Sequence, residues 1–551
     1  MVVREPGRVA NTRHASVSPA RSKKVEKAIA DDHFLEEMGH KPELQRNFSF
    51  ISMLGLAFAI LNSWTALAVS MSVALPSGGP TSVIWGLITA GICSICLASS
   101  LAEFLSAYPT AGGQYHWVAI VSPSSMQRFL SYFTGWINVG GWIAMAATGP
   151  LLASQLITGI IALMHPSYEP QRWHQFLMYL AYSFLGFVVN AFGNAILPIV
   201  NKACFYWSMT GFVVISIVVL STAAPDFATA EYVFGRFENE TGWPDGVAWL
   251  LGLLQGAFGL AAYDSVAHMI EEIPNARVQG PRVMVGSVLI GISTGFIFLV
   301  CLLFASGGSK NFESLITTAE TPLIHIFSIA TKSKAGAVCL TMFPLLCMIF
   351  TTMSLFTASS RMSYAFARDN GLPFSTSFAH LHQKLKVPLN ALILTLVGVI
   401  IFGLIYLGSS SAFNAITSAA VVWLNMSYGI PVTINLLSGR SKLPPRHFHL
   451  GNLVGYIFNI VGILYVILTT VLFLFPPSVP TTGNTMNYCV VAYAILLIFM
   501  MGWWIAHARK QYKGPPIEAM VRAAHKWGGL VEQHSPSSSS KSLHADKPLV
   551  D

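Results

Sequence analysis

The sequence predicts an all-α integral membrane protein with twelve transmembrane helices. Of its 551 residues, 53% are apolar and only 10% are charged, whereas an average soluble domain has about 25% charged residues. Four long stretches contain no Asp, Glu, Lys or Arg, and each is long enough for one or two spans of about 20 residues. These stretches are 48–102, 129–168, 387–439 and 447–508. This composition excludes a soluble enzyme, a nucleic-acid binder and a disulfide-stapled secreted domain.

Apolar runs separated by short, turn-rich loops set the expected helix boundaries. The segment from Pro76 to Pro80, for example, separates the first two helices with two prolines and two glycines. The twelve predicted helices are 50–75, 81–107, 127–163, 172–194, 198–222, 245–270, 283–306, 335–364, 387–408, 412–437, 451–475 and 486–508.

The distribution of basic residues predicts that both termini are cytoplasmic. With that orientation, 27 of the 32 Lys and Arg residues lie on the cytoplasmic side, in agreement with the positive-inside rule. Residues 1–47 are then expected to be a disordered cytoplasmic N-tail, and residues 509–551 a cytoplasmic C-tail whose Ser-rich end, 535–542, is disordered. The two tails flank a twelve-helix domain, 48–508. The loop after the fifth helix contains the sequon of Asn239, which we expect to be glycosylated on the outer face, in the plasma membrane.

Two predicted helices have irregular centres at equivalent positions, as expected if helices 1–5 and 6–10 are inverted repeats. The first helix carries Asn62, Ser63 and Trp64 in its middle, and the sixth carries Gly256 and Gly259. A matched pair of interrupted helices is the best sequence indication of a substrate site in a transporter. Close helix packing is the alternative explanation for any single glycine in a membrane helix.

Three segments carry a resemblance to a known superfamily. Residues 98–118 read ASSLAEFLSAYPTAGGQYHWV, residues 264–276 read DSVAHMIEEIPNA, and residues 360–373 read SRMSYAFARDNGLP. They resemble the amino acid–polyamine–organocation superfamily. Asn62-Ser63-Trp64 and Ser77-Gly78-Gly79-Pro80 are similar to the fungal amino acid/choline transporter family within it, which contains choline and 4-aminobutyrate permeases.

This resemblance covers about residues 45–510 and implies a five-plus-five inverted-repeat fold with two extra helices. It also implies a carrier, rather than an enzyme, that works by alternating access. The proton gradient would drive such a carrier, without a cofactor or a bound metal.

The substrate is expected to bind between the two interrupted helices, where polar groups and aromatic faces come together. Leu56 to Ser77 contains no glycine, so a tight nest of amides for a carboxylate is harder to build in the first helix. Aromatic rings could instead hold an organic cation, at about 0.5–2 kcal/mol each. The candidate substrate-binding residues are Asn62, Ser63, Trp64, Gln255, Gly256, Phe258, Gly259 and Tyr263.

Charged residues within spans are costly and usually functional, so they are the candidates for coupling and gating. Asp264, His268 and Glu272 are spaced i, i+4, i+8 and share one face of the sixth helix, with Glu271 beside it. The alternative for the two glutamates is an interfacial pairing with Arg277 or Arg282.

Glu103 ends the second helix and is expected to pair structurally with a basic residue from a loop. The family pattern suggests Arg361 as that partner.

The function predicted from these features is proton-coupled transport of a small nitrogenous substrate. Choline or a related organic cation is the favoured substrate. An amino acid or 4-aminobutyrate permease, or a transporter of a specialised nitrogenous metabolite, is the alternative within the same class. A substrate sensor without transport is the alternative outside it. The expected partners are the substrate and membrane lipid, with no nucleic acid.

Overall fold

A computed structural model describes residues 32–39, 50–193, 196–318, 321–408, 411–483 and 485–533, and every regular element in these ranges is helical. Eleven described helices are long and apolar enough to cross a membrane. They are Ile51–Val69, Met71–Ala107, Gln127–Met164, Arg172–Phe192, Leu197–Ala223, Ala276–Ala305, Lys334–Arg368, Leu389–Gly408, Ala412–Leu437, Asn452–Leu472 and Cys489–Gln511. The all-helical membrane architecture is therefore as predicted, with one span fewer by this measure.

The missing span is the predicted sixth helix, which the structure divides into short pieces. Helix α10 (Asp245–Gly259) ends at the glycine that the sequence singled out, and α11 (Ser265–His268) follows after five non-helical residues. A 3₁₀ turn, Ile270–Glu272, completes the segment. Neither helix has the roughly 20 residues that a span requires.

The first predicted helix is also divided. Helix α2 (Phe50–Leu61) and α3 (Ser63–Val69) are separated by Asn62, and the segment labelled α4 (Met71–Ala107) consists of two helices that meet at a kink. The kink lies at Gly78 and Gly79, where Gly79 has a φ of 61°, a left-handed value that a side chain would strain. The expected boundary between the first two helices is thus confirmed, and it takes the form of a sharp kink.

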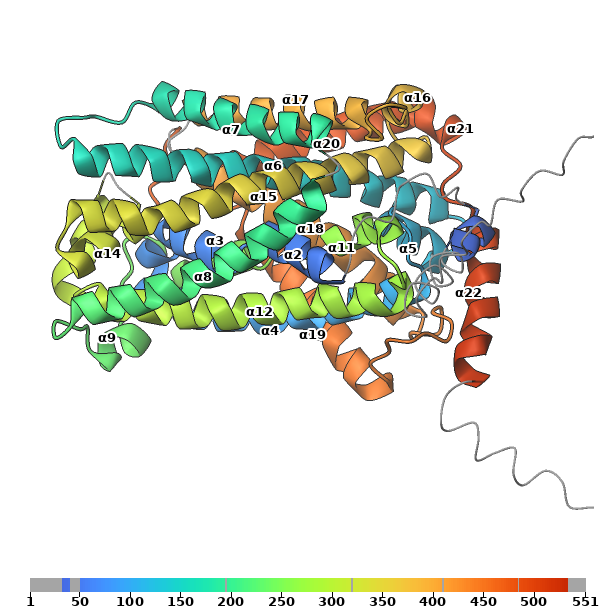
Figure 1. The fold of residues 1–551 in the computed structure, drawn as a ribbon. Coiled ribbons are helices and arrows are strands. Elements are labelled where there is room, and N and C mark those ends of the chain that lie inside the picture. Colours follow the sequence, from blue (N-terminus) through green and yellow to red (C-terminus); the bar gives the residue numbers. More distant parts are fainter. Residues whose placement is uncertain are drawn as a thin grey trace, which may run out of the picture.

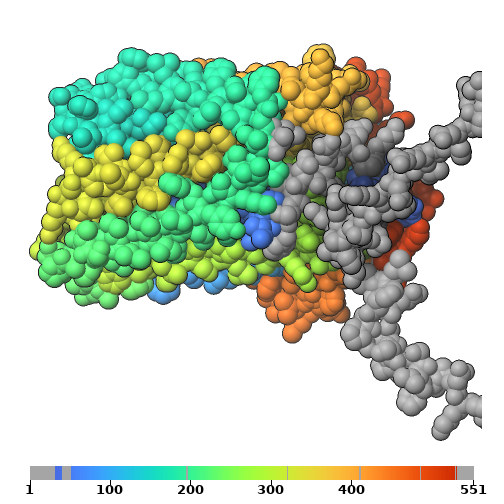
Figure 2. Space-filling model, in the orientation of Figure 1, coloured from blue at the N-terminus to red at the C-terminus, as the bar shows by residue number. Residues whose placement is uncertain are grey.

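The long helices lie roughly along one common axis (Figure 1). The face shown in Figure 2 is formed by α7 (Arg172–Phe192), α8 (Leu197–Ala223), α12 (Ala276–Ala305) and α15 (Lys334–Arg368). Large apolar side chains are exposed on these helices, for example Phe192, Ile199, Ile217 and Ile297. An apolar exterior of this kind is suited to lipid rather than to water.

One end of the bundle, which we call the tail end, carries the described parts of both predicted tails (Figure 1). Residues 32–37 are helical and contact α22 (Ile517–Gln533), where the Phe34 and Trp527 rings lie 5.5 Å apart. The Glu37 carboxylate accepts hydrogen bonds from Lys526 and Trp527, and the bond from Lys526 is the larger cause of its lowered pKa. Residues 32–37 of the N-tail are therefore folded, whereas the sequence suggested disorder there. Residues 1–31, 40–47 and 534–551, which include the Ser-rich end of the C-tail, lie outside the described residues.

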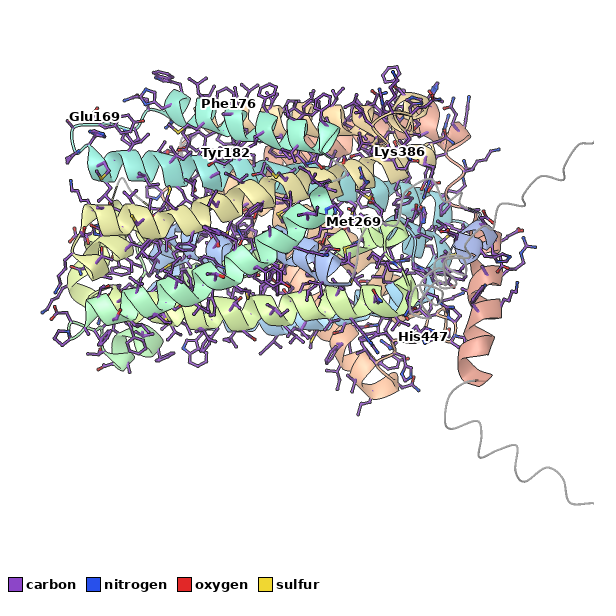
Figure 3. The ribbon with its side chains drawn as sticks, in the orientation of Figure 1. Glu169, Phe176, Tyr182, Met269, Lys386 and His447 are labelled. Carbon is purple, nitrogen blue, oxygen red and sulfur yellow. The ribbon has the colours of Figure 1, made fainter. Side chains whose placement is uncertain are left out.

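The opposite end, which we call the far end, carries α9 (Ala230–Gly235) and the loop 236–244 that contains Asn239. Glu169 lies at this end, while Lys386 and His447 lie toward the tail end (Figure 3). Phe176 and Tyr182 lie between them along α7, so the charged side chains and the apolar ones occupy different levels of the bundle.

Candidate substrate and coupling site

The two divided helices meet at the centre of the bundle, where each break contains a residue in the left-handed conformation. Asn62 has a φ of 37° between α2 and α3, and Ala262 has a φ of 66° between α10 and α11. Asparagine adopts this conformation more readily than other residues with side chains, because its short polar group bonds locally. The first helix therefore breaks without glycine, which weakens the sequence argument that no amide nest can form there.

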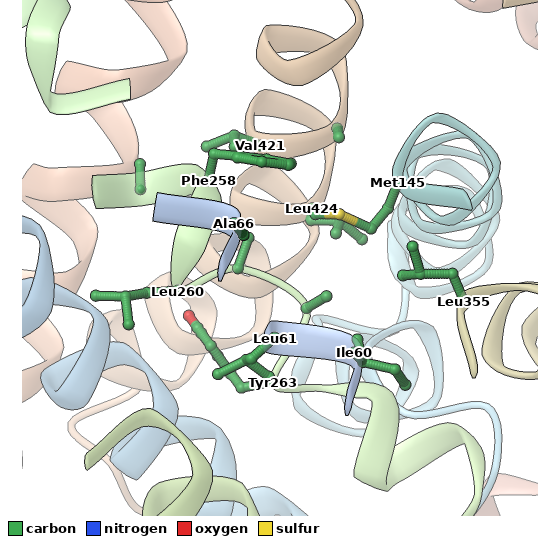
Figure 4. Close-up of a cluster of buried hydrophobic side chains, with 14 of the residues drawn as sticks. Ile60, Leu61, Ala66, Met145, Phe258, Leu260, Tyr263, Leu355, Val421 and Leu424 are labelled. Atoms are coloured by element: carbon green, nitrogen blue, oxygen red, sulfur yellow. The ribbon is translucent and has the colours of Figure 1, made fainter. Parts of the chain in front are cut away.

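Apolar side chains from several helices border the space between the breaks (Figure 4). Leu61 comes from α2, Phe258 from α10 and Tyr263 from the second break, and all three are buried. Across from them lie Met145 of α6 (Gln127–Met164), Leu355 of α15, and Val421 and Leu424 of α18 (Ala412–Leu437). Phe258 and Tyr263 are thus placed where the sequence expects a substrate to bind.

Polar atoms beside this cluster lack hydrogen-bond partners among the described residues. They are Asn62 Oδ1, Ser63 Oγ and Gln255 Oε1, and all three side chains are buried. The amide nitrogens are satisfied, since Asn62 Nδ2 donates to Thr351 Oγ1 at 3.0 Å and Gln255 Nε2 donates to the Leu67 carbonyl at 2.6 Å. Buried polar atoms are nearly always hydrogen-bonded in proteins. Three unsatisfied oxygens at two helix breaks therefore indicate a place for a polar ligand or water.

Three other candidate substrate residues make packing contacts instead. Trp64 is fully buried, donates from Nε1 to Ser208 Oγ of α8 at 2.7 Å, and lies edge-on to Phe298 of α12 at 4.7 Å. A Cβ atom at Gly256 would meet the α4 backbone at 3.0 Å, and one at Gly259 would lie 2.5 Å from Leu67. These contacts favour close helix packing for all three residues.

Because of this difference, we expect Trp64→Ala to reduce the amount of folded protein and Phe258→Ala to reduce transport by the folded protein. Trp64→Ala opens a cavity between α3, α8 and α12, at a cost of about 3–5 kcal/mol, so the amount of folded protein should fall. Phe258→Ala should leave most of the protein folded and reduce uptake per folded molecule. Fluorescence-detected size exclusion and uptake measured on the same cells separate the two effects. Normal folding of Trp64→Ala with lost uptake would restore Trp64 as a substrate contact.

Asp264 is the centre of a buried hydrogen-bond network at the start of α11. Its Oδ2 atom accepts from Gln114 Nε2 at 2.8 Å, Trp142 Nε1 at 3.1 Å and His268 Nε2 at 3.0 Å. Its Oδ1 atom accepts from the Tyr428 hydroxyl at 2.6 Å. Asp264 and His268 are both fully buried. A carboxylate with four donors is held in one position by α5 (Gln114–Val121), α6, α11 and α18.

The contacts of His268 fix how many protons the Asp264–His268 pair holds. Its Nδ1 atom lies 2.9 Å from the carbonyl oxygen of Ala111, which can only accept, so Nδ1 carries a hydrogen. Its Nε2 atom faces Asp264 Oδ2, so a second hydrogen lies between these two atoms. One hydrogen on Nδ1 and one shared between Nε2 and Oδ2 satisfy both contacts, and the pair is neutral with these two hydrogens.

The segment 108–113, between α4 and α5, joins this pair to the tail end. The Ala111 carbonyl binds His268, and the Ala111 amide donates to Glu271 Oε1 at 3.2 Å. The adjacent glycines allow close approach, because a Cβ atom at Gly112 would lie 2.4 Å from the His116 ring and one at Gly113 would lie 3.3 Å from His268. His268 and Glu271 therefore contact the same residue of this segment, Ala111.

Ion pairs join the buried acidic residues to basic residues at the tail end. Glu272 accepts from Arg361 Nε at 2.9 Å, and Glu271 accepts from Arg368 Nη2 at 3.1 Å. Both glutamates are buried.

Glu103 makes ion pairs with two arginines that follow α18. Arg440 Nη2 lies 2.8 Å from its Oε2 atom, and Arg446 contacts its Oε1 atom. The expectation of a basic partner from a loop is confirmed. The suggested partner Arg361 is wrong, because Arg361 lies on α15 against Glu272.

Sequence reasoning missed Gln114, Trp142 and Tyr428, which donate to Asp264 from three other helices. The signal for Gln114 was present in the sequence, because this residue lies in the segment 98–118 that carries the resemblance. Trp142 and Tyr428 are flanked by ordinary membrane-helix residues, and no local pattern distinguishes them from packing aromatics.

Comparison with known proteins places this arrangement in a family. The profile described as "Amino acid permease" matches residues 48–500. The chain is 38% identical over 451 residues to a Macrophomina phaseolina protein named as an amino acid/polyamine transporter, covering 80% of this chain and 97% of the relative. It is 33% identical over 472 residues to the choline transporter of Saccharomyces cerevisiae (85% and 83% covered). It is 29% identical over 500 residues to amino-acid permease BAT1 of Arabidopsis thaliana (87% and 95% covered). The chain therefore belongs to the amino acid permease family of membrane transporters.

Proposed function

We propose that this permease is a proton-coupled carrier and that choline or a related organic cation is the first substrate to test. The observation that carries the proposal is the buried, hydrogen-bonded Asp264–His268 pair, which lies between the helix breaks and the tail-end ion pairs. The described residues around it supply every hydrogen bond that the carboxylate makes. A fully enclosed titratable pair beside a substrate site is an arrangement suited to coupling.

The proposed mechanism follows from the number of protons on the pair. If one proton leaves, His268 keeps a single ring hydrogen, which cannot serve both Ala111 and Asp264. One of the two contacts must then break. Loss of the Ala111 contact frees the segment 108–113, which also holds Glu271. Proton release would in this way loosen the tail end and open the path to that side.

A crossing count supports twelve spans arranged as five plus five with two extra helices. The helix of residues 32–37 contacts α22, so the chain between them crosses the membrane an even number of times. Eleven spans are long enough alone, and α10 with α11 supplies the twelfth. The charge distribution supports a cytoplasmic tail end.

Choline is favoured over an amino acid by the rings of Phe258 and Tyr263, which border the breaks and offer aromatic faces to an organic cation. The choline transporter of yeast is also among the relatives. An amino acid or polyamine is the second candidate, because the 38% identical relative is named for both.

An uptake screen in a permease-deficient yeast tests the proposal. Labelled choline, 4-aminobutyrate, spermidine, and neutral and basic amino acids are compared, with and without a protonophore and external sodium. We expect choline uptake that the protonophore abolishes and that sodium does not affect. Uptake that requires sodium would contradict proton coupling, and counterflow in proteoliposomes would separate a carrier from a sensor.

We expect Asn239 to be glycosylated if the far end is extracellular. The Asn239 side chain lies in the loop 236–244, where Thr241 Oγ1 donates to its Oδ1 atom at 2.7 Å. Asn239→Gln should therefore remove a mobility shift that an endoglycosidase also removes. A glycan traced instead to Asn47, which lies outside the described residues, would reverse the orientation.

A further inference from the structure

A cavity of about 460 Å³ opens at the far end of the bundle. Its walls come from the start of α4, from α6, α10 and α18, and from the loops that precede α10 and α20 (Cys489–Trp503). The volume is within the range of sites that hold small molecules, about 300–1,000 Å³. The lining residues include Ser72, Gln155, Glu240, Leu254, Phe413, Asn414, Ser418, Phe473 and Phe475.

The cavity has a negative charge without a balancing cation. Glu240 is the only charged residue among the described residues that line it, and it makes no ion pair within the described part of the chain. Its neighbour Glu238, in contrast, is paired with Arg236 at 2.6 Å. A carboxylate at the mouth of a cavity attracts cations and repels anions.

The backbone that carries Glu240 is held in place over the cavity. The Glu240 amide donates to the Pro76 carbonyl at 2.8 Å, and Val479 donates to the Thr241 carbonyl at 2.8 Å. The Trp243 ring stacks on Phe475 at 5.8 Å, which joins the two loops a second time. The backbone at Glu240 is therefore positioned by the fold, and its side chain is exposed.

The cavity also contains hydrogen-bonding groups without partners. Ser418 is 1% exposed, and its Oγ atom has no partner among the described residues. The Asn414 Oδ1 atom is also buried and has no hydrogen-bond partner among these residues. Asn414 Oδ1 can only accept, so it requires a donor. The rings of Phe413, Phe473 and Phe475 add apolar faces. A carboxylate, an acceptor and aromatic rings together match a small organic cation that bears a hydroxyl or an N–H group.

We propose that this cavity is a separate binding site for small organic cations, which a substrate occupies before it reaches the helix breaks. Leu254 lies in the cavity wall and its neighbour Gln255 lies at the breaks, so the two sites are adjacent along α10. Ser418 likewise precedes Val421 of the central cluster by less than one turn of α18. The inference rests on the proposed function only for the order of the two sites.

Equilibrium binding to the purified full-length protein tests the proposal. The probes are choline and its neutral isostere 3,3-dimethyl-1-butanol, measured by calorimetry for the wild type, Glu240→Gln and the control Glu238→Gln. We expect Glu240→Gln to weaken choline binding about three- to tenfold, because one unit charge a few ångströms away is lost. The control should not change choline binding, and the neutral isostere should bind weakly to all three proteins. Asn414→Leu should also weaken choline binding.

Two results would overturn the inference: equal choline affinity of the wild type and Glu240→Gln, or no choline binding at all. Initial uptake rates separate this failure from failure of the proposed function. If choline is taken up but binds equally well to the wild type and to Glu240→Gln, the cavity site is refuted and the transporter assignment stands. If Glu240→Gln weakens choline binding but the wild type takes up no choline, the cavity site is supported and choline is refuted as the transported substrate.

Discussion

Asp264→Asn is expected to abolish concentrative uptake while exchange of labelled substrate across the membrane continues. The amide keeps the size of the side chain and can still accept from Tyr428 or Gln114. It removes the negative charge that holds the second proton on His268, so the neutral ring no longer needs to gain or lose a proton during the cycle. We expect accumulation against a gradient to fall by at least tenfold, measured in proteoliposomes with an imposed pH gradient.

The control for this variant is Asp226→Asn, the same chemical change at an exposed carboxylate paired with Lys332 at 3.0 Å. It should accumulate substrate like the wild type, because exposed pairs contribute little. Normal accumulation by Asp264→Asn, with only a weaker apparent affinity, would make Asp264 a recognition group for a cationic substrate. It would refute the coupling role.

Glu272→Gln is expected to destabilise the folded transporter strongly. Arg361 and Glu272 are both at least 95% buried, and removal of one partner leaves the other charge in a medium of low polarity. Breaking a buried pair in this way costs about 3–5 kcal/mol, whereas removing both partners costs much less. Arg361→Gln should have a similar effect, and the double variant should be more stable than the sum of the two losses predicts.

Thermal unfolding in detergent, followed by size exclusion, measures this effect. The matched control is Glu238→Gln, which breaks the exposed pair with Arg236 and should leave the apparent melting temperature almost unchanged. An equal shift for Glu272→Gln and Glu238→Gln would show that the buried pair does not hold the tail end together.

Composition and periodicity were sufficient to predict the fold class, because a membrane span requires a long apolar run that nothing else explains. They also located both breaks, since Asn62 and Gly259 interrupt otherwise continuous apolar segments. The helices of the tails could not be predicted in the same way. Phe34 and Trp527 are isolated aromatic residues in polar segments, and only the docked structure shows that they pack together.

Side-chain partners in three dimensions were the least predictable part of the site. The i, i+4 spacing of Asp264 and His268 correctly placed both on one face, because that relation is local. The partner of Glu103 depends on how the segment after α18 folds back, over more than 300 residues of sequence, so a family pattern selected the wrong arginine. Trp64 was expected at the substrate for its polar neighbours, yet its contacts are with α8 and α12.

The most direct test of the coupling account is whether a pH gradient alone drives accumulation in proteoliposomes that contain the purified wild-type protein. The substrate is the one that the uptake screen identifies, the buffers are free of sodium, and the membrane potential is clamped with potassium and valinomycin. The account predicts accumulation inside when the outside is acidic, its collapse on addition of a protonophore, and no accumulation with Asp264→Asn. Accumulation driven by a sodium gradient at equal pH, with none driven by protons, would contradict it.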